Sequence, residues 1–374
     1  MLNEAHKSRV LEIFEHLHAH PEISWEEHQT TRYVQNFLEE QGLKTTLFDD
    51  CTGVMAEFGS GGPIVGIRSD LDALWQEVDG CFRANHSCGH DGHMSIAMGV
   101  LLALKNRKDL PPGTLRFIFQ PAEEKGTGAL KLMEKGVLQD LSWLFGVHLR
   151  PIQEVPAHRA SCNIYHGASC FMSGIILGED AHGARPHKGV NAIEVGAQMV
   201  QMLAAIRLNP AQSWSVKMTR FQAGGKSANI IPGKAEFFLD LRAQNNEIMM
   251  LLRQKVAGVV SALSSLYEIP IEAVVQSETV AARPDAHAEA VLARAIAEVL
   301  GPENQLPPVV TPGGEDFHYY TVKCPELKGA MLGLGCDLSP GLHHPQMTFR
   351  RESLYDGIEI LARAAVFALE SEVS

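Results

Sequence analysis

Three short apolar runs in the first half of the chain each end at polar residues, and this pattern constrains the fold more than any other feature. The runs and their endings are IVGIRS (64–69) before Asp70, TLRFIF (114–119) just before Glu123 and Glu124, and SWLFGV (142–147) before His148. Apolar runs of this length are typical of strands buried on both faces. A helix is predicted between the first two runs, from about His90 to Lys105. The alternation predicts an α/β fold with a mainly parallel sheet and helices on both faces.

Ligands in open α/β sheets gather outside the carboxyl ends of the strands. The polar residues that follow the three runs are therefore expected at one edge of the sheet. A helix that starts in the capping box of Ser24 and Glu27 is predicted to run to about Glu40, with Gly42 as its left-handed end.

The character of the chain changes at about Phe171. The predicted order is a strand at 172–177 (MSGIIL), a helix at 190–207, strands at 214–221 and 234–242, and a helix at 246–264. This order indicates an inserted α+β domain with an antiparallel sheet and helices on one face. The predicted division is a catalytic domain at 1–170, a lid and dimerisation domain at 171–282, and a return to the catalytic domain at 283–374.

Composition excludes several classes of function. The chain has 374 residues with 32 Lys and Arg against 44 Asp and Glu, a net charge of -12, and no basic run. Nucleic acid and anionic membranes are therefore poor partners. The N-terminal segment lacks the apolar core of a secretion signal, no apolar run is long enough to span a bilayer, and the seven cysteines show no framework spacing. These features predict a cytoplasmic protein with reduced thiols.

Cys88 and His90 flank a single glycine where a helix is predicted to begin. This spacing can aim a thiolate and an imidazole at one ion, and the helix N-terminus favours the thiolate. A cysteine near a helix start is more often a small buried apolar residue. The additional His86, Asp91 and His93 favour a metal site.

Glu123 and Glu124 are adjacent carboxylates that repel each other unless a cation or a proton separates them. One could bind a metal while the other acts as a base. An equally good explanation is an acidic first turn of a helix that begins near Lys125. His148 and His343 are lone histidines, which more often form structural hydrogen bonds than bind metal.

Eight segments, in order, resemble motifs of the aminoacylase-type dinuclear metallopeptidase family. They are RSDLDAL, CGHDGH, QPAEE, GVHLRP, AHGARPHKGVNAI, ANIIPGKAEF, GGEDF and LHHP. The similarity spans nearly the whole chain from residue 20 and is greatest to the amidohydrolases that cleave N-acyl amino acids, hippurate and auxin conjugates.

The resemblance implies two divalent metal ions per subunit, with Zn, Mn, Co or Ni as candidates. The implied ligands are Cys88, His90, Glu124, His148 and His343, with the Cys88 sulfur in the place of an aspartate bridge found in other branches. Glu123 matches the family's general acid and base. Lid residues matched to the family are His182, which would reach the substrate oxyanion, usually from a partner subunit, and Asn229 and Arg242, which would hold the substrate carbonyl region and carboxylate.

The resulting hypothesis is hydrolysis of the amide bond of a small N-acyl amino acid by a water that two metal ions activate, with Glu123 as base. The resemblance also implies a homodimer formed through the lid domain. One alternative is a thiol-dependent hydrolase with Cys88 as nucleophile. Another is a metal-binding homologue without catalytic activity.

Supporting residues and departures from the family pattern complete the predicted site. Asp70 and Asp72 are expected to orient the ligand histidines, and Glu315 and Asp316 are expected to be structural or supporting. The usual Asp-Ala-Leu-Pro of the family ends in Trp75 here, and the usual His-Ser-Pro reads His343-His344-Pro345. Register favours His343 as the ligand, and both departures bear on substrate range.

Overall fold

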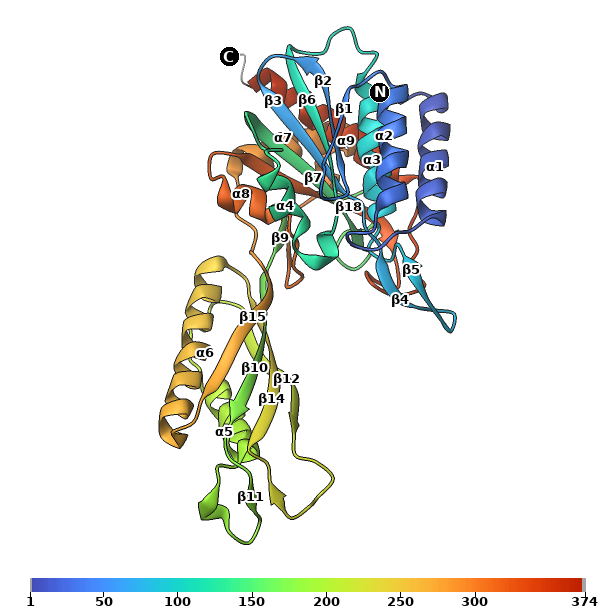
Figure 1. The fold of residues 1–374 in the computed structure, drawn as a ribbon. Coiled ribbons are helices and arrows are strands. Elements are labelled where there is room, and N and C mark those ends of the chain that lie inside the picture. Colours follow the sequence, from blue (N-terminus) through green and yellow to red (C-terminus); the bar gives the residue numbers. More distant parts are fainter. Residues whose placement is uncertain (1, 372–374) are drawn as a thin grey trace. The chain divides into compact units, whose positions relative to one another are not determined.

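The computed structural model describes residues 2–371 (Figure 1). The chain divides into two compact units, each considered by itself below. Unit 1 runs to Tyr165 and resumes at Arg283–Val310 and from Asp316 onward. Unit 2 comprises His166–Ala282 and Thr311–Glu315.

Unit 1 is built on an eight-stranded sheet. Its strands, in spatial order, are β1 (Thr45–Leu47), β2 (Val54–Ser60), β6 (Gly113–Gln120), β3 (Ile64–Asp70), β7 (Leu141–Pro151), β18 (Lys328–Leu338), β8 (Ala160–Ser161) and β16 (Gln305–Leu306). The four central strands, β6, β3, β7 and β18, are parallel to one another. β1, β2 and β8 pair in the antiparallel sense with their inner neighbours.

Helices cover both faces of this sheet (Figure 1). The helices of unit 1 are α1 (Glu4–Ala19), α2 (His28–Glu40), α3 (His90–Leu104), α4 (Gly128–Glu134), α7 (Ala286–Leu300), α8 (His318–Lys323) and α9 (Ser353–Ser371). Val65 and Ile67 of β3 belong to the core that α3 and α9 share. Arg68, the residue after Ile67, points to the opposite face and lies over the ring of Phe317 at the start of α8. The predicted α/β class is therefore confirmed.

Short elements complete unit 1. A separate hairpin consists of β4 (Leu74–Val78) and β5 (Cys81–Asn85). Two 3-10 turns are Glu123–Lys125 and Pro302–Asn304. β9 (Ile164–His166) and β17 (Val309–Thr311) lie where the sequence passes between the two units.

The start of α2 differs from the prediction. The helix begins at His28, and the Ser24 hydroxyl donates to Asp72 Oδ2 at 2.6 Å instead of capping it. A capping serine accepts from a backbone N–H in the first helical turn, whereas the charge-assisted bond that Ser24 donates holds its side chain at the buried Asp72 carboxylate. The predicted end is confirmed, because Gly42 has φ +83°.

β7 also runs further than predicted. It continues beyond His148 to Pro151, so this histidine lies inside the strand and not at its end. The reason is that β18 continues beside it, pairing Gly333 with His148 and Gly335 with Arg150.

Unit 2 contains a four-stranded antiparallel sheet with two helices (Figure 1). Its strands, in spatial order, are β12 (Trp214–Ala223), β14 (Lys234–Ala243), β10 (Ala168–Leu177) and β15 (Ile271–Thr279). Phe237, Leu239 and Leu241 of β14 are buried in a core with α5 (Ala192–Ala204) and α6 (Asn246–Tyr267). A two-stranded ribbon joins β11 (Ala181–His182) to β13 (Ile230–Ile231), and a 3-10 turn spans Pro186–Lys188. The predicted antiparallel sheet with helices is confirmed.

No helix among the described residues combines the length and the apolar character needed to cross a bilayer.

Candidate metal centre

Cys88 and His90 are brought together by the left-handed turn that opens α3. Gly89, between them, has φ +88° and is the N-cap residue of the helix. A side chain at this position would be strained, because L-residues rarely adopt this conformation. Every residue of α3 is buried, so the turn is fixed from behind by the core of unit 1.

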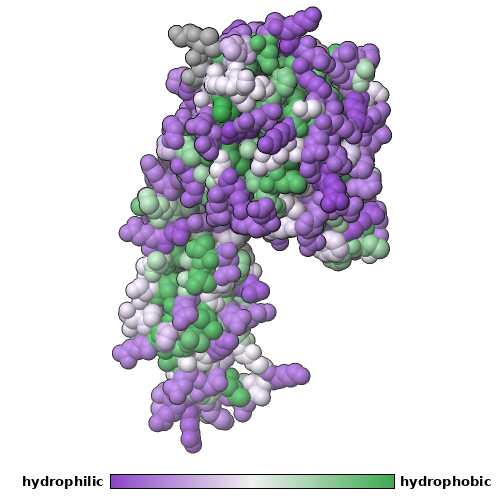
Figure 2. Space-filling view, turned by 45° about the horizontal axis from the view of Figure 1, so that its top comes forward, coloured by the Kyte–Doolittle hydropathy of each residue, from purple (hydrophilic) through white to green (hydrophobic). Residues whose placement is uncertain are grey.

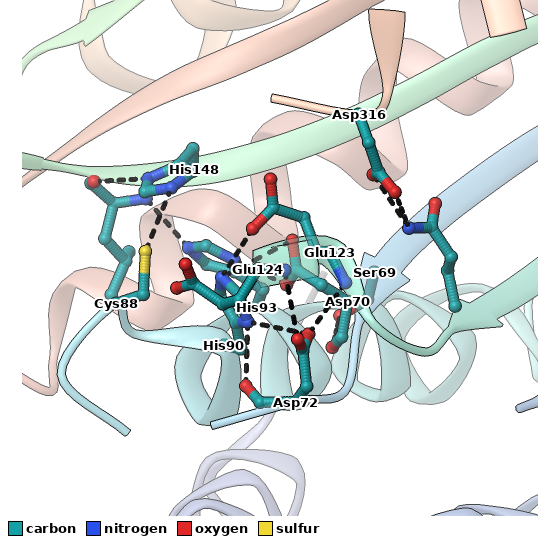
Figure 3. Close-up of polar contacts among 12 residues, drawn as sticks. Ser69, Asp70, Asp72, Cys88, His90, His93, Glu123, Glu124, His148 and Asp316 are labelled. Atoms are coloured by element: carbon teal, nitrogen blue, oxygen red, sulfur yellow. Dashed lines mark hydrogen bonds and ion pairs between the residues drawn. The ribbon is translucent and has the colours of Figure 1, made fainter. Parts of the chain in front are cut away.

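The five predicted ligands form two groups of donor atoms that share Cys88; Figure 3 shows four of them, Cys88, His90, Glu124 and His148. One group consists of Cys88, His90 and His148, and the other of Cys88, Glu124 and His343. Within each group the donor atoms lie within 4.8 Å of one another. A sulfur common to two donor groups is the arrangement that a bridging ligand between two ions requires.

Hydrogen bonds fix the orientation of the two buried histidines. His90 donates from Nδ1 to the backbone oxygen of Asp72 at 2.8 Å, and His148 donates from Nδ1 to the backbone oxygen of Leu149 at 2.8 Å. In the neutral form of each ring Nδ1 therefore holds the proton and Nε2 carries the lone pair. His90 Nε2 is buried and has no hydrogen-bond partner, and His148 Nε2 lies 3.6 Å from Cys88 Sγ. A buried imidazole lone pair without a donor is well suited to a metal ion.

His343, and not His344, joins the donor atoms. His343 Nε2 lies 3.3 Å from Glu124 Oε1. His344 is exposed, and its Nδ1 accepts from the backbone N–H of Gln346 at 3.1 Å. Of the two histidines, His343 is thus the one that lies with Cys88 and Glu124.

Asp72, two residues after β3, is hydrogen-bonded to the backbone of the glutamate pair. Its carboxylate accepts from the backbone N–H groups of Glu123 and Glu124 at 3.1 and 3.0 Å. Ala122, just before them, has φ +52°, an uncommon conformation for a residue other than glycine. The turn brings one carboxylate oxygen of each glutamate and a ring nitrogen of His90 within 4.8 Å of one another, and Glu123 Oε2 lies 3.9 Å from His90 Nε2.

His93 was considered with the other nearby histidines in the sequence, but both its nitrogens are occupied. Its Nε2 accepts from the backbone N–H of Leu149 at 3.0 Å, so Nδ1 carries the proton and donates to Asp70 Oδ1 at 2.8 Å. Burial alone would raise the pKa of Asp70, but His90, His93 and Arg68 hold that pKa well below its usual value. Asp70 is thus a carboxylate that supports the histidines from behind, as its sequence position predicts.

A buried network behind Asp70 was missed by the sequence analysis. Arg68 donates to Asp70 at 2.7 Å, to Asp316 at 2.8 Å and to Gln120 at 2.9 Å. Tyr320 donates to the same amide oxygen of Gln120 at 3.0 Å. An arginine inside an apolar strand was the available signal, because a buried guanidinium requires anionic partners. Asp316 is thus part of this buried hydrogen-bond network.

The buried thiol and its histidine neighbour have shifted pKa values. Burial, followed by the Glu124 carboxylate, raises the pKa of the Cys88 thiol. Burial, His93 and Arg150 lower the pKa of His148 well below its usual value. Burial therefore opposes formation of the thiolate, His90 and His343 favour it, and a bound cation would stabilise it further.

The three predicted lid residues lie in unit 2. His182 is exposed on the β11–β13 ribbon, and its Nδ1 accepts from the backbone N–H of Ala184 at 3.0 Å, which leaves the proton on Nε2. Asn229 adjoins it, because its backbone oxygen accepts from Gly183 N–H at 2.8 Å. Arg242 lies near the far end of β14, where it pairs with Asp240 at 2.7 Å and lies over the ring of Phe171. The ribbon and Arg242 are separate locations within the unit.

The chain matches the model of peptidase family M20/M25/M40 over residues 66–366 and belongs to that family. Membership makes it a hydrolase that acts on amide bonds. An N-acetylcysteine deacetylase of Bacillus subtilis is 30% identical over 99% of this chain and 100% of that protein. An N-acetyldiaminopimelate deacetylase of Streptococcus pneumoniae is 29% identical over 91% of this chain and 94% of that protein.

Solved structures show the same fold. A dinuclear metal-binding peptidase of the M20 family from Bacillus subtilis has a TM-score of 0.82 at 28% identity, covering 98% of this chain and 99% of that chain. A structure from methicillin-resistant Staphylococcus aureus has a TM-score of 0.89 at 24% identity, covering 98% and 97% of the two chains. The family resemblance stated from the sequence is confirmed.

Proposed function

We propose that this protein is a metal-dependent amidohydrolase that releases an amino acid from a small N-acyl amino acid. The observation that carries the proposal is the pair of donor groups that share Cys88 beside the Glu123 carboxylate. The names of the relatives support the substrate class, since both deacetylases remove an acetyl group from an amino acid.

Two divalent ions fit the donor set: Cys88, His90 and His148 would hold one ion, and Cys88, Glu124 and His343 would hold the other. A bound cation would satisfy the orphaned Nε2 of His90, and it would stabilise the Cys88 thiolate against the burial that raises the pKa of this thiol. Sulfur, imidazole and carboxylate donors suit Zn, Mn, Co or Ni. The ions would supply Lewis acidity and lower the pKa of a water molecule that attacks the amide carbon.

Glu123 is proposed as the general base and acid. It accepts a proton from the attacking water and delivers it to the amide nitrogen as the carbon–nitrogen bond breaks. Its backbone N–H is bonded to Asp72, which also accepts from Glu124, so the base and its neighbour hold fixed positions. Fixed positions matter because proton transfer requires hydrogen-bond distance to the reacting atoms.

His182, Asn229 and Arg242 are proposed to contact the substrate from unit 2. Arg242 lies eight residues along β14 from Lys234, the end of the strand nearest the ribbon. Eight residues of extended strand span roughly 26 Å. One small substrate cannot reach both locations on the same subunit. We therefore infer that His182 of the partner subunit donates from Nε2 to the oxyanion, while Arg242 pairs with the substrate carboxylate.

A homodimer through the lid domain follows from this sharing. Exposed large apolar side chains are concentrated in unit 2, and hydrophobic residues are visible on its surface in Figure 2. They include Ile193, Val200, Met250, Leu251, Leu266 and Val274. Contiguous exposed apolar surface is typical of association sites. The lid at 171–282 and a cytoplasmic location complete the proposal.

The thiol-hydrolase alternative is disfavoured by electrostatics. A nucleophilic cysteine requires a depressed pKa and a basic histidine. Burial raises the pKa of the Cys88 thiol more than the nearby His90 and His343 lower it, so the thiol is not activated as a nucleophile. Chelation provides the test: a cysteine nucleophile would stay active in EDTA, whereas the proposed enzyme loses activity and recovers it when Zn, Mn or Co is added.

The catalytic assignment is tested with Glu123→Gln and an exposed control, Glu134→Gln. The Glu123 variant should retain the metal content of the wild type and lose at least about 100-fold in rate, the usual contribution of a general base. The control should match the wild type in both. Released amine is measured on acetyl, benzoyl and longer acyl amino acids. A metal-replete Glu123→Gln enzyme of near-normal rate would refute the assignment.

Subunit sharing is tested by mixing two inactive variants, His182→Ala and Glu123→Ala. Mixed dimers contain one active site with both native residues, so activity should reappear on mixing and the dimer should be seen by light scattering. Absence of recovery in confirmed mixed dimers would show that each subunit uses its own His182.

A further inference from the structure

The β4–β5 hairpin is joined to the loop that carries His343 by two amide side chains. Gln76 Nε2 donates to the backbone oxygen of His343 at 3.0 Å. Asn85 Nδ2 donates to Gln76 Oε1 at 2.8 Å and to the backbone oxygen of Pro345 at 3.1 Å. The two amides therefore connect with each other and with both sides of His344.

His343 differs from the other histidines of the site in how it is supported. His90 lies in a buried helix and His148 in a central strand, and each donates from Nδ1 to a backbone oxygen. The His343 side chain is half-exposed, lies in a loop and belongs to a residue with φ +63°. A residue other than glycine keeps such a backbone conformation when its surroundings impose it.

Two backbone hydrogen bonds impose that conformation. The His343 N–H donates to the backbone oxygen of Ser87, next to Cys88, at 2.8 Å. The His343 carbonyl accepts from Gln76 on the hairpin. The peptide on one side is thus fixed to the Cys88 turn, and the peptide on the other side is fixed to the amide pair.

We propose that Gln76 and Asn85 are positioning residues for His343. They hold its imidazole against Glu124 and Cys88 and so set the affinity of that donor group for its metal ion. The group formed by Cys88, His90 and His148 does not depend on them, because its histidines are oriented by bonds of their own. This inference rests on the proposed two-ion centre, which it deepens by distinguishing the two positions.

The hairpin supplies a matched control on its opposite face. Gln76 and Asn85 are diagonal neighbours on one face, since Leu74 pairs with Asn85. Phe82 pairs with Glu77 on the other face, where both side chains are exposed. Substitution of Phe82 therefore perturbs the same hairpin without touching the amide pair.

The experiment titrates Zn or Co into metal-stripped protein and measures stoichiometry and affinity by calorimetry. Wild type and Phe82→Ala should bind two ions per chain with the same affinities. Gln76→Ala should weaken one of the two by about 10- to 100-fold, as is usual when a ligand loses its supporting hydrogen bond, and leave the other unchanged. The double variant Gln76→Ala with Asn85→Ala should be little worse than Gln76→Ala, because the two amides act as a unit.

Gln76→Glu separates positioning from packing. It keeps the size of the side chain and removes the N–H that bonds the His343 carbonyl. A weakened ion in this variant, with a circular dichroism melting curve like that of wild type, supports positioning. Two ions bound with wild-type affinities by Gln76→Ala and Gln76→Glu would overturn the inference. Fewer than two ions in wild type would instead contradict the proposed centre itself.

Discussion

At the scale of single residues, the site depends on backbone conformations that cost energy. Ala122, which precedes the proposed base Glu123, and His343, itself a proposed ligand, both have positive φ. Such conformations cost on the order of 1–3 kcal/mol, so they persist only where other contacts fix them. For Ala122 one such contact is its backbone N–H bond to the buried Glu27 carboxylate at 2.8 Å. Directing Glu123 and His343 into the site therefore draws on the stability of the surrounding fold.

A second residue-scale property is the acid sensitivity expected from His318. Burial, followed by Arg68, lowers the pKa of His318 to about 3, whereas the unfolded value is about 6.5. As the pH falls, His318 takes up a proton in the unfolded chain at a higher pH than in the folded protein. The neutral His318 therefore contributes its full stabilisation of the folded state above about pH 6.5, and this is lost as the pH falls toward about 3. Between pH 7 and 5 the loss amounts to about 2 kcal/mol.

The prediction is checked by urea unfolding of the metal-free protein at pH 7, 6 and 5. In His318→Asn the free energy of unfolding should fall by about 2 kcal/mol less between pH 7 and 5 than in the wild type. This holds even if the variant is less stable than the wild type at pH 7. The exposed His287→Asn is the control and should follow the wild-type slope. Parallel pH profiles for wild type and His318→Asn would contradict the assignment.

At the scale of elements, α3 connects the core to the metal centre. Its first residue, His90, contributes a donor atom, and its remaining length packs against α1, α9 and β3. Gly99 allows the close approach to α9, because a Cβ at that position would lie 2.7 Å from Ile358 Cγ1. The helix is therefore held in place by a contact nine residues from the ligand it presents.

Gly99→Ala should destabilise the protein by about 1–3 kcal/mol through this overlap. Ile358→Ala should cost about 2–5 kcal/mol, because it leaves a cavity. The double variant should lose less than the sum of the two, since the new methyl group occupies part of the cavity. Urea unfolding of the four proteins gives the coupling energy, and strict additivity would show that the two helices do not meet at Gly99.

At the scale of the whole molecule, the proposed chemistry is divided between the two units. The predicted metal ligands and Glu123 lie in unit 1, and His182, Asn229 and Arg242 lie in unit 2. Metal binding should thus stabilise unit 1 directly. A ligand at 100 times its dissociation constant contributes about 2.7 kcal/mol for each site.

Chelation should therefore lower the midpoint temperature of unfolding, and its effect on local stability should be confined to the segments that carry the proposed ligands. Hydrogen exchange should lose protection at residues 86–93, 121–125 and 341–345, and α6 should exchange at an unchanged rate. Addition of Zn to the metal-stripped protein should restore both the midpoint temperature and the protection from hydrogen exchange. Equal loss of protection in α6 would show that the ions stabilise the two units together.

The sequence by itself determined the fold class, the family and the chemical nature of the site. Apolar runs followed by polar residues indicated parallel strands with functional side chains beyond them, because strand burial and the position of strand ends are properties of short segments. The Cys-Gly-His turn and the glutamate pair are also local, so their donor types were evident from residues 88–90 and 123–124.

Only the tertiary structure decided which donors converge. His90 and His93 are three residues apart, and the difference between them arises from the backbone groups of Asp72 and Leu149 that occupy their nitrogens. Ser24 bonds to Asp72, 48 residues away, instead of capping its own helix. The direction of a polar side chain is set by its hydrogen-bond partners, and partners distant in sequence come into reach only when the chain has folded.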